Sequence, residues 1–245
     1  MRYFLELSYL GTHFHGWQRQ NNATSVQQVL EESLSLLLKE DIAIIGCGRT
    51  DKGVHAKQFF AHIDNDIELE YPDKLGYKLN GLLSKDIAIH RTFSVHDDAH
   101  TRFDATSRSY EYHLNQRKNP FKQLTSYDFR QPLNVEAMNA AAVLLLETEE
   151  FGAFCKAGSE NKTMFCNVTQ AEWKVDGSDM VFHITADRFL RNMVRAVVGT
   201  LIEVGLGRIT KGGFHEIIKS QNRNEAGPSA PAHGLYLTQI KYPYI

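Results

Sequence analysis

Paired cysteines are missing from this sequence. Cys47, Cys155 and Cys166 are its three cysteines in 245 residues, an odd number with no Cys-x-x-Cys spacing. Neither a disulfide framework nor a cysteine zinc site is therefore indicated. Cysteine usage of this kind is typical of a protein in a reducing, cytoplasmic compartment.

Long hydrophobic runs are also lacking. The longest extends from Ala140 to Leu146, far too short to span a bilayer. The first residues, Met1 to Glu6, alternate polar and apolar and contain no apolar stretch of a signal peptide. We therefore expect no membrane partner and a cytoplasmic location.

The sequence has no excess of positive charge and no metal or nucleotide motif. Its 27 Lys and Arg face 29 Asp and Glu, for a formal net charge of −2. Binding of a nucleic acid would then require a local basic surface, which exists only if the fold brings Lys and Arg side chains together on one face. His-Glu-x-x-His, an Asp-rich calcium loop, a phosphate loop and a dinucleotide-binding glycine motif are all absent. We expect neither a metal nor a cofactor.

A glycine-rich stretch at residues 46–56 is the most informative feature present. Gly46, Gly48 and Gly53 permit turns that other residues resist, and they bracket Arg49 and Asp51. Apolar residues on both sides predict a strand, a loop and a second strand. A rigid loop of this kind suits a charged pair aimed at a substrate. The spacing alone leaves open a tight turn whose Arg and Asp simply face water.

The hydrophobic pattern predicts two α+β halves with antiparallel sheets, 1–100 and 101–245. Strands are expected near 2–8, 42–47, 58–63, 86–93, 108–115, 168–175, 179–186 and 235–241. Helices are expected after a capping box at 24–27, from Pro72, from Asn134 to about 147, at 187–204 and near 213–220. In the helix expected at 187–204, Arg188, Arg191 and Arg195 would share an arc opposite the apolar face. From the pattern alone, that arc is a solvated polar face.

Several blocks resemble one enzyme family, in order along nearly the whole chain. The string Gly-Arg-Thr-Asp-Lys-Gly-Val-His at 48–55 resembles the catalytic motif of the tRNA pseudouridine synthase A (TruA-type) family. Four further blocks are similar to that family: Tyr9-x-Gly11 with 16–20, 102–106 with Tyr110 and Tyr112, 189–195 with Gly199, and 226–237.

The resemblance implies a fold and an activity. The fold would be that of pseudouridine synthases, with two similar α/β halves and mainly antiparallel sheets flanking a central basic cleft. The half 1–100 would carry the catalytic Asp loop, and the half 101–245 the active-site Tyr and Arg. The activity would be isomerisation of uridine to pseudouridine at positions 38, 39 and 40 of the tRNA anticodon stem-loop, by a homodimer. This reaction imports no group and changes no redox state, so it needs no cofactor and no metal.

The resemblance also assigns catalytic roles. Asp51 would be the nucleophile, although attack on C1′ and abstraction of a sugar proton both remain open. Arg195 would pair with Asp51 and keep it ionised. Tyr110 would contact the target base. Tyr112 alternates onto the same strand face, so geometry does not choose between the tyrosines and the family motif does. Arg49 would fill the space of a flipped base or hold its phosphate.

Further residues are expected to contact tRNA. His100, Arg102 and Phe103 match one tRNA-contacting segment of the family. Lys162 carries over from a second, Gly158 to Lys162, whose other residues differ. Arg188 and Arg191 would hold phosphates. Lys52 and Thr101 depart from the alanines usual in the family, and neither change removes a chemical role.

Two functions of other kinds compete with this interpretation. One is a catalytically silent RNA-binding protein, which would not need an isolated carboxylate beside RNA. The other is a nucleotide hydrolase using Asp51 with a metal, which predicts clustered carboxylates or histidines that the sequence does not display. A simple RRM module is disfavoured because its aromatic signature is absent.

Overall fold

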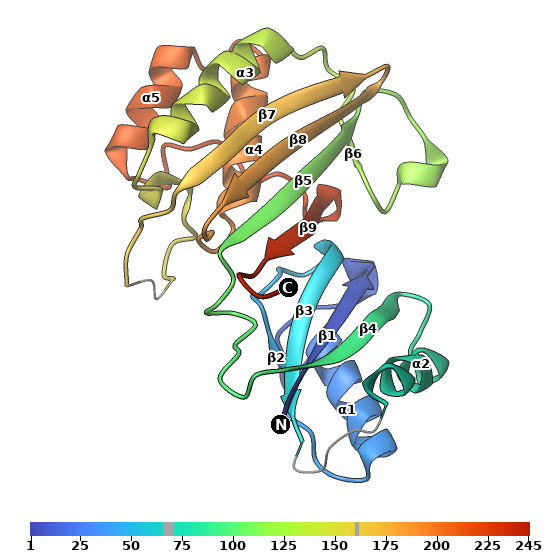
Figure 1. The fold of residues 1–245 in the computed structure, drawn as a ribbon. Helices are drawn as coiled ribbons and strands as arrows, with labels where there is room; N and C mark the ends of the chain where they lie inside the picture. The colour runs from blue at the N-terminus through green and yellow to red at the C-terminus, as the bar shows by residue number, and fades with distance from the viewer. Residues whose placement is uncertain (66–70, 160–161) are drawn as a thin grey trace. The chain divides into compact units, whose positions relative to one another are not determined.

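The computed structural model describes residues 1–65, 71–159 and 162–245 (Figure 1). The chain divides into two compact units. The first, here called the N-unit, contains residues 1–106 and 236–245, and the second, the C-unit, contains residues 107–235. Within the described residues, no helix is long and apolar enough to cross a bilayer.

The N-unit is a mainly antiparallel sheet with two helices. Its strands are β1 (Arg2–Tyr9), β2 (Ile45–Gly46), β3 (His55–Asp64), β4 (Ile87–Val95) and β9 (Leu235–Lys241). Its two α-helices are α1 (Val26–Leu38) and α2 (Pro72–Leu82), and a short 3-10 helix, η1 (Gly11–His13), follows β1. The strand order is β4-β1-β3-β9, with β2 paired to β3. All pairs are antiparallel except β3 with β9, where His55 lies opposite Tyr236.

Local sequence signals explain the ends of the N-unit helices. The hydroxyl of Ser25 accepts a hydrogen bond from the backbone N–H of Gln28 and caps the start of α1, one residue later than the box expected at 24–27 would place the cap. Lys39 ends α1 in the left-handed conformation, with φ 61°. Pro72 lies in the first turn of α2, where its missing N–H costs nothing. The strand expected at 42–47 was too long, since only Ile45–Gly46 pairs with β3.

In the C-unit, three helices lie on one face of its strands (Figure 1). Its strands are β5 (Ser107–Asn115), β6 (Tyr127–Asp128), β7 (Val168–Asp176) and β8 (Asp179–Ala186). Its α-helices are α3 (Val135–Ala142), α4 (Met193–Gly205) and α5 (Lys211–Ser220). Four 3-10 turns complete it: η2 (Pro120–Lys122), η3 (Val143–Glu147), η4 (Gly152–Phe154) and η5 (Ala232–Gly234). Strands β5, β8 and β7 are antiparallel neighbours, and β6 runs parallel to β5.

Helix α4 begins later than the sequence predicted. It starts at Met193, because Asn192 adopts a left-handed conformation with φ 64° that no helix can continue through. Before it, the carboxylate of Asp187 accepts hydrogen bonds from two backbone N–H groups, those of Asn167 and Arg188. The expectation of one helix over 187–204 is therefore wrong, and Arg188 and Arg191 do not share a helical arc with Arg195.

The middle of α4 packs against the backbone of residues 227–230. A Cβ on Gly199 would lie 1.7 Å from the carbonyl oxygen of Pro228. The hydroxyl of Thr200 accepts a hydrogen bond of 3.0 Å from the N–H of Gly227. The helix is buried over most of its circumference, so this contact cannot be relieved by rotating the helix.

This contact predicts opposite effects for one substitution at two helical glycines. Gly199→Ala should lower the free energy of unfolding by roughly 1–3 kcal/mol or more, because the added methyl overlaps a fixed carbonyl. Gly212→Ala in α5, whose Cβ would have no neighbour closer than 3.8 Å, should leave stability unchanged or raise it by up to about 1 kcal/mol. Urea unfolding midpoints measure both, and equal effects would contradict the packing described.

Candidate active site

The glycine-rich loop between β2 and β3 is held by hydrogen bonds on several sides. The hydroxyl groups of Thr50 and Tyr9 lie 2.9 Å apart in a buried hydrogen bond. The carbonyl of Thr50 also accepts a bond of 3.3 Å from the N–H of Trp17. At the end of the loop, Gly53 has φ 81° and the N–H of Val54 donates to the carbonyl of Asp51. The loop is thus a braced turn.

Residues 11–17 lie directly against this loop, backbone to backbone. A Cβ on Gly16 would lie 2.3 Å from the carbonyl oxygen of Thr50, and a Cβ on Gly11 would lie 1.9 Å from that of Val54. Gly16 also has φ 83°, which favours glycine independently. Trp17 is buried and stacks on Phe59 with ring centroids 4.2 Å apart. These contacts explain the sequence block formed by Tyr9, Gly11 and residues 16–20: it packs against the loop and stabilises it.

Asp51 and Arg49 lie on this one loop, as predicted. Asp51 is half-buried, while Arg49 and Lys52 are exposed. The Arg49 guanidinium donates from Nε to Oε1 of Gln18 at 3.2 Å. The loop therefore places a half-buried carboxylate, which can act as a nucleophile or base, near an anchored arginine that can bind an anionic group of a substrate.

His55, the last residue of the string 48–55, has a structural role. It is buried, and its Nδ1 accepts a hydrogen bond of 2.9 Å from the N–H of Gly11. Its ring packs on Tyr236 at 4.6 Å, and Lys57 places its ammonium 5.3 Å from the same tyrosine ring. His55 therefore ties η1 and β9 to the start of β3.

Residues 100–104 of the N-unit form a compact turn with an exposed aromatic ring. The backbone N–H groups of Arg102 and Phe103 both approach Nδ1 of His100, at 3.1 and 3.3 Å. The carboxylate of Asp104 accepts from the N–H of His100 and from the hydroxyl of Tyr244. Phe103 is 74% exposed, and its ring centroid lies 4.3 Å from the His100 ring and 5.5 Å from the Arg102 guanidinium. Such a surface can stack on a base and neutralise a phosphate.

A buried histidine supports this turn from below. Nδ1 of His62 lies 2.8 Å from the hydroxyl of Thr101, and its ring contacts that of His100. Its Nε2 is buried and has no hydrogen-bond partner among the described residues. Burial, with Arg2 and His100 nearby, lowers the pKa of His62 from 6.5 to about 4. His62 is therefore neutral at physiological pH.

The two tyrosines of β5 differ in accessibility. Tyr112 is fully buried, donates its hydroxyl to the carbonyl of Pro231 at 2.9 Å, and has its pKa raised by desolvation. Tyr110 is half-buried, with its ring edge-on to Phe189 at 5.0 Å. Strand alternation left both tyrosines open as candidates, but only Tyr110 has surface available for a ligand.

The arginines of the C-unit have distinct surroundings. Arg195 lies in the first turn of α4, half-buried, and its Nε donates to the carbonyl of Ala230 at 2.7 Å. Arg188 donates to the hydroxyl of Thr163 at 2.9 Å and to the carbonyl of Phe165 at 3.3 Å. Arg191 is exposed, and its carbonyl accepts from the N–H of Lys156.

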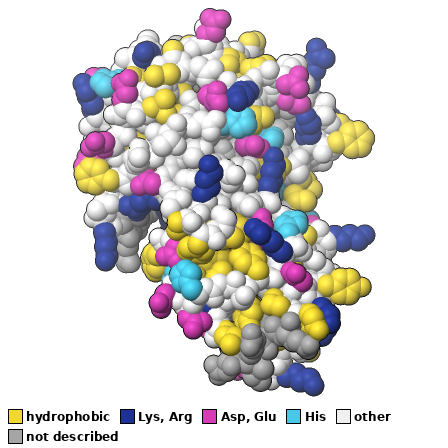
Figure 2. All heavy atoms as spheres, in the orientation of Figure 1, with side chains coloured by type: hydrophobic (Ala, Val, Ile, Leu, Met, Phe, Trp, Pro, Cys, Tyr) yellow, Lys and Arg dark blue, Asp and Glu magenta, His cyan; other side chains and the backbone are white. Residues whose placement is uncertain are grey.

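The remaining predicted contact segment is described only in part. Lys162 is exposed, while Glu160 and Asn161 of the segment 158–162 lie outside the described residues. On the face drawn in Figure 2, Lys and Arg side chains are interspersed with Asp and Glu. That face therefore does not gather charge of one sign.

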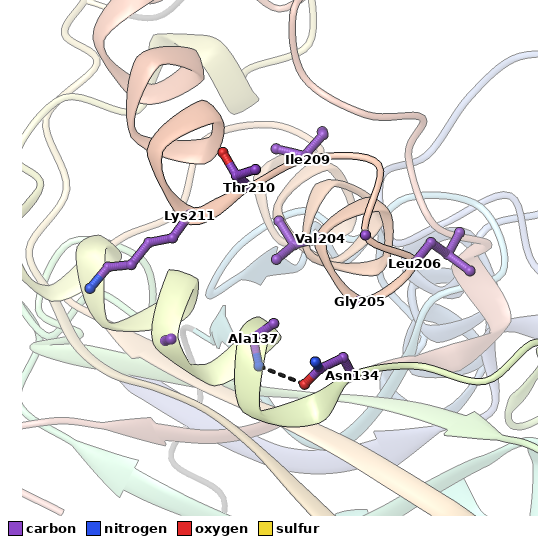
Figure 3. Close-up of a pocket in the computed structure, with 10 residues that line it drawn as sticks. Asn134, Ala137, Val204, Gly205, Leu206, Ile209, Thr210 and Lys211 are labelled. Carbon is purple, nitrogen blue, oxygen red and sulfur yellow. Dashed lines mark hydrogen bonds between the residues drawn. The ribbon is translucent and has the colours of Figure 1, made fainter.

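A cavity of about 540 Å³ lies among α3, α4 and α5 (Figure 3). Asn134 and Thr210 at its edge already cap α3 and α5, because they accept from the N–H groups of Ala137 and Gly213. Lys211 is the only ionisable side chain among its lining residues. The cavity therefore lacks an acid–base pair and is not the candidate active site. In the described part of the chain, no three His, Cys, Asp or Glu side chains are grouped so that they could hold a metal.

Comparison with known proteins gives matches along nearly the whole chain. The sequence model of a family described as tRNA pseudouridine synthase matches residues 7–104 and 141–243. The tRNA pseudouridine synthase A of Bacteroides thetaiotaomicron is 47% identical over 245 residues, covering 99% of this chain and 91% of that protein. Those of Bacteroides fragilis and Porphyromonas gingivalis are each 46% identical, covering 99% of this chain and 96% and 97% of the relatives. A solved structure of a CRISPR endoribonuclease Cse3 bound to RNA is 10% identical with a TM-score of 0.21, over 84% of this chain and 97% of that one, which is too weak to carry an argument.

The lowered pKa of His62 predicts acid sensitivity. Between pH 6.5 and about 4 the unfolded chain binds a proton at this histidine that the folded chain does not, so the free energy of unfolding should fall as the pH is lowered through that window. His62→Gln should make this fall shallower, whereas His215→Gln, at an exposed position on α5, should not. Urea midpoints at pH 7, 6 and 5 measure the slopes. An unchanged slope in His62→Gln would refute the assignment.

Proposed function

Because the chain belongs to the tRNA pseudouridine synthase family, we propose that it isomerises uridine to pseudouridine at positions 38, 39 and 40 of the tRNA anticodon stem-loop. The observation that carries this proposal is the family match in both units, combined with a braced loop that presents Asp51. The reaction breaks the N1–C1′ bond, turns the uracil and joins C5 to C1′, and a proton is lost from C5 while one is gained at N1. Atoms and electrons balance within the nucleotide, so the protein needs a carboxylate, a hold on the base and a proton acceptor.

Asp51 takes the role of the carboxylate. It either attacks C1′ to give a covalent ester or removes a sugar proton to give a glycal, and in both routes it must be ionised. Its place in a turn fixed by Thr50 and Gly53 supports this role, because a preorganised group loses little entropy when the substrate binds.

Tyr110 and Arg195 are proposed to serve the same uridine. Tyr110 contacts the base and assists removal of the C5 proton, which its half-buried position supports. Arg195 stabilises the ionised form of Asp51. The hydrogen bond from its Nε to Ala230 supports that role, since it fixes the plane of the guanidinium.

The other basic and aromatic residues are proposed to bind tRNA. Flipping a stacked base costs a few kcal/mol, and Arg49 offsets this by filling the vacated space or holding the phosphate. His100, Arg102 and Phe103 offer an exposed ring beside a cation, which supports stacking on a nucleotide. Lys162, Arg188 and Arg191 contact phosphates.

The finer architecture is proposed on the same basis. The half 1–100 carries the Asp loop and the half 101–245 the Tyr and Arg, and their sheets flank a central basic cleft. The enzyme acts as a homodimer in the cytoplasm, with one tRNA reaching both subunits, as in the family that its motifs resemble.

The first test is pseudouridine formation on unmodified tRNA in the presence of a chelator. The wild-type protein should form it, and Asp51→Asn should abolish it while leaving tRNA binding within about twofold, because the amide keeps the shape but loses the nucleophile and base. Asp41→Asn, at an exposed position ahead of β2, is the matched control and should be fully active. Turnover above a few per cent in Asp51→Asn would remove Asp51 from its role.

A second test separates the two roles proposed for arginines. Arg195→Met should lower turnover of bound tRNA by at least about 100-fold with little change in affinity, since it leaves a carboxylate uncompensated. Arg195→Lys should restore part of the rate, because an ammonium cannot reproduce the guanidinium fork. Arg188→Met should instead weaken binding and flatten its salt dependence. If Arg195→Met changes affinity alone, then Arg195 is a phosphate contact.

A further inference from the structure

A directed chain of hydrogen bonds leads from helix α1 to Arg49. Nε of Arg49 donates to Oε1 of Gln18 at 3.2 Å, and Nε2 of Gln18 donates to Oε1 of Gln27 at 2.7 Å. Nε2 of Gln27 then donates to Oε1 of Glu31 at 2.9 Å. Each donor points toward the helix, and the chain ends on a carboxylate. All four residues belong to the N-unit.

Backbone groups fix the orientation of this chain. Oε1 of Gln27 accepts from the N–H of Arg19 at 3.0 Å, and its Nε2 also donates to the carbonyl of Ile44 at 3.2 Å. A backbone N–H cannot accept and a carbonyl cannot donate, so the Gln27 amide has one possible orientation. Gln18 must then turn its NH₂ toward Gln27 and its carbonyl oxygen toward Arg49.

The far end of the chain is firmly anchored. Glu31 is 8% exposed and lies on the inner side of α1. Its Oε2 accepts from Nη1 of Arg19 at 2.9 Å, and its Oε1 also accepts from the N–H of Ile44 at 3.3 Å. Hydrogen bonds that share one direction and end on a charged group polarise and strengthen one another.

We propose that Gln18 is a positioning residue that fixes the direction of the Arg49 guanidinium toward the target nucleotide. This inference rests on the proposed function, in which Arg49 contacts the flipped base or its phosphate. An exposed arginine loses much rotamer freedom when it binds, and a fixed acceptor on Nε removes part of that loss in advance. With Nε engaged by Gln18, the guanidinium offers its two terminal nitrogens to an anionic oxygen pair.

Activity measurements with a matched control test the proposal. Gln18→Met keeps the length of the side chain without the acceptor and should lower kcat/KM on unmodified tRNA by about tenfold. Gln18→Glu keeps an acceptor for Arg49 and should recover part of this loss. Gln28→Met is the control, because Gln28 lies next to Gln27 on α1 and donates to Glu32 instead, outside the chain. It should retain wild-type kcat/KM.

A double-mutant cycle distinguishes positioning from general support of the fold. If Gln18 acts through Arg49, Gln18→Met should add nothing to the loss caused by Arg49→Met. An equal further loss in the Arg49→Met background would overturn the inference. A fully active Arg49→Met would also overturn it, because the arginine would then have no role to position.

A spectroscopic measurement keeps the inference testable if the proposed activity itself fails. In the folded protein, the Arg49 Nε–H should give a ¹⁵N-resolved NMR signal with slowed solvent exchange, assigned by its loss in Arg49→Met. Gln18→Met should speed this exchange at least about tenfold, while Gln28→Met leaves it unchanged. An Arg49 signal insensitive to Gln18→Met would refute the positioning role whatever the enzyme's substrate.

Discussion

The carbonyl oxygen of Thr50 lies so close to Gly16 that there is no room for a side chain between these two backbone segments. The turn that carries Asp51 therefore has a fixed neighbour that cannot withdraw without breaking the buried hydrogen bonds of Thr50. Rigidity of this kind suits catalysis by a single carboxylate, since its position is settled before the substrate arrives. Gly11 and Gly16 are thus required by the close approach of Val54 and Thr50, which belong to the loop.

Around that contact, both apolar packing and directed hydrogen bonds stabilise the loop that carries Arg49 and Asp51. Trp17 and Phe59 hold the underside of the loop by stacking. The hydrogen bond from Arg49 to Gln18 restrains an exposed arginine at the solvent-facing edge of the loop. Stacking stabilises the buried part of this region, because dispersion is strongest between closely packed groups. Hydrogen bonds position the exposed arginine, because a charged group needs aligned acceptors.

Much of the fold was predictable from local patterns, and the exceptions have physical causes. The cap at Asn134 and the strand at 2–8 follow from spacing alone, and the cap of α1 lies one residue beyond its expected position. The start of α4 does not follow from spacing, because Asn192 is held left-handed by a tertiary hydrogen bond from its side chain to Ser229. In the candidate site, the loop around Asp51 was predictable from its glycines. Gln18 carried no periodic signal. Its role depends on an amide orientation that is set through Gln27, whose own amide is fixed by the N–H of Arg19 and the carbonyl of Ile44.

The last strand has a consequence for how the chain is made. β9 pairs in parallel with the start of β3, and the following Tyr242 donates its hydroxyl to the carbonyl of Thr101. During synthesis, β3 leaves the ribosome long before β9. The edge of β3 that pairs with β9 therefore remains unpaired for on the order of ten seconds at ordinary translation rates. During that interval Phe4 and Phe60, which Tyr242 covers in the finished fold, lack their aromatic lid. The N-unit can therefore complete its apolar packing only after residues 236–245 have been synthesised.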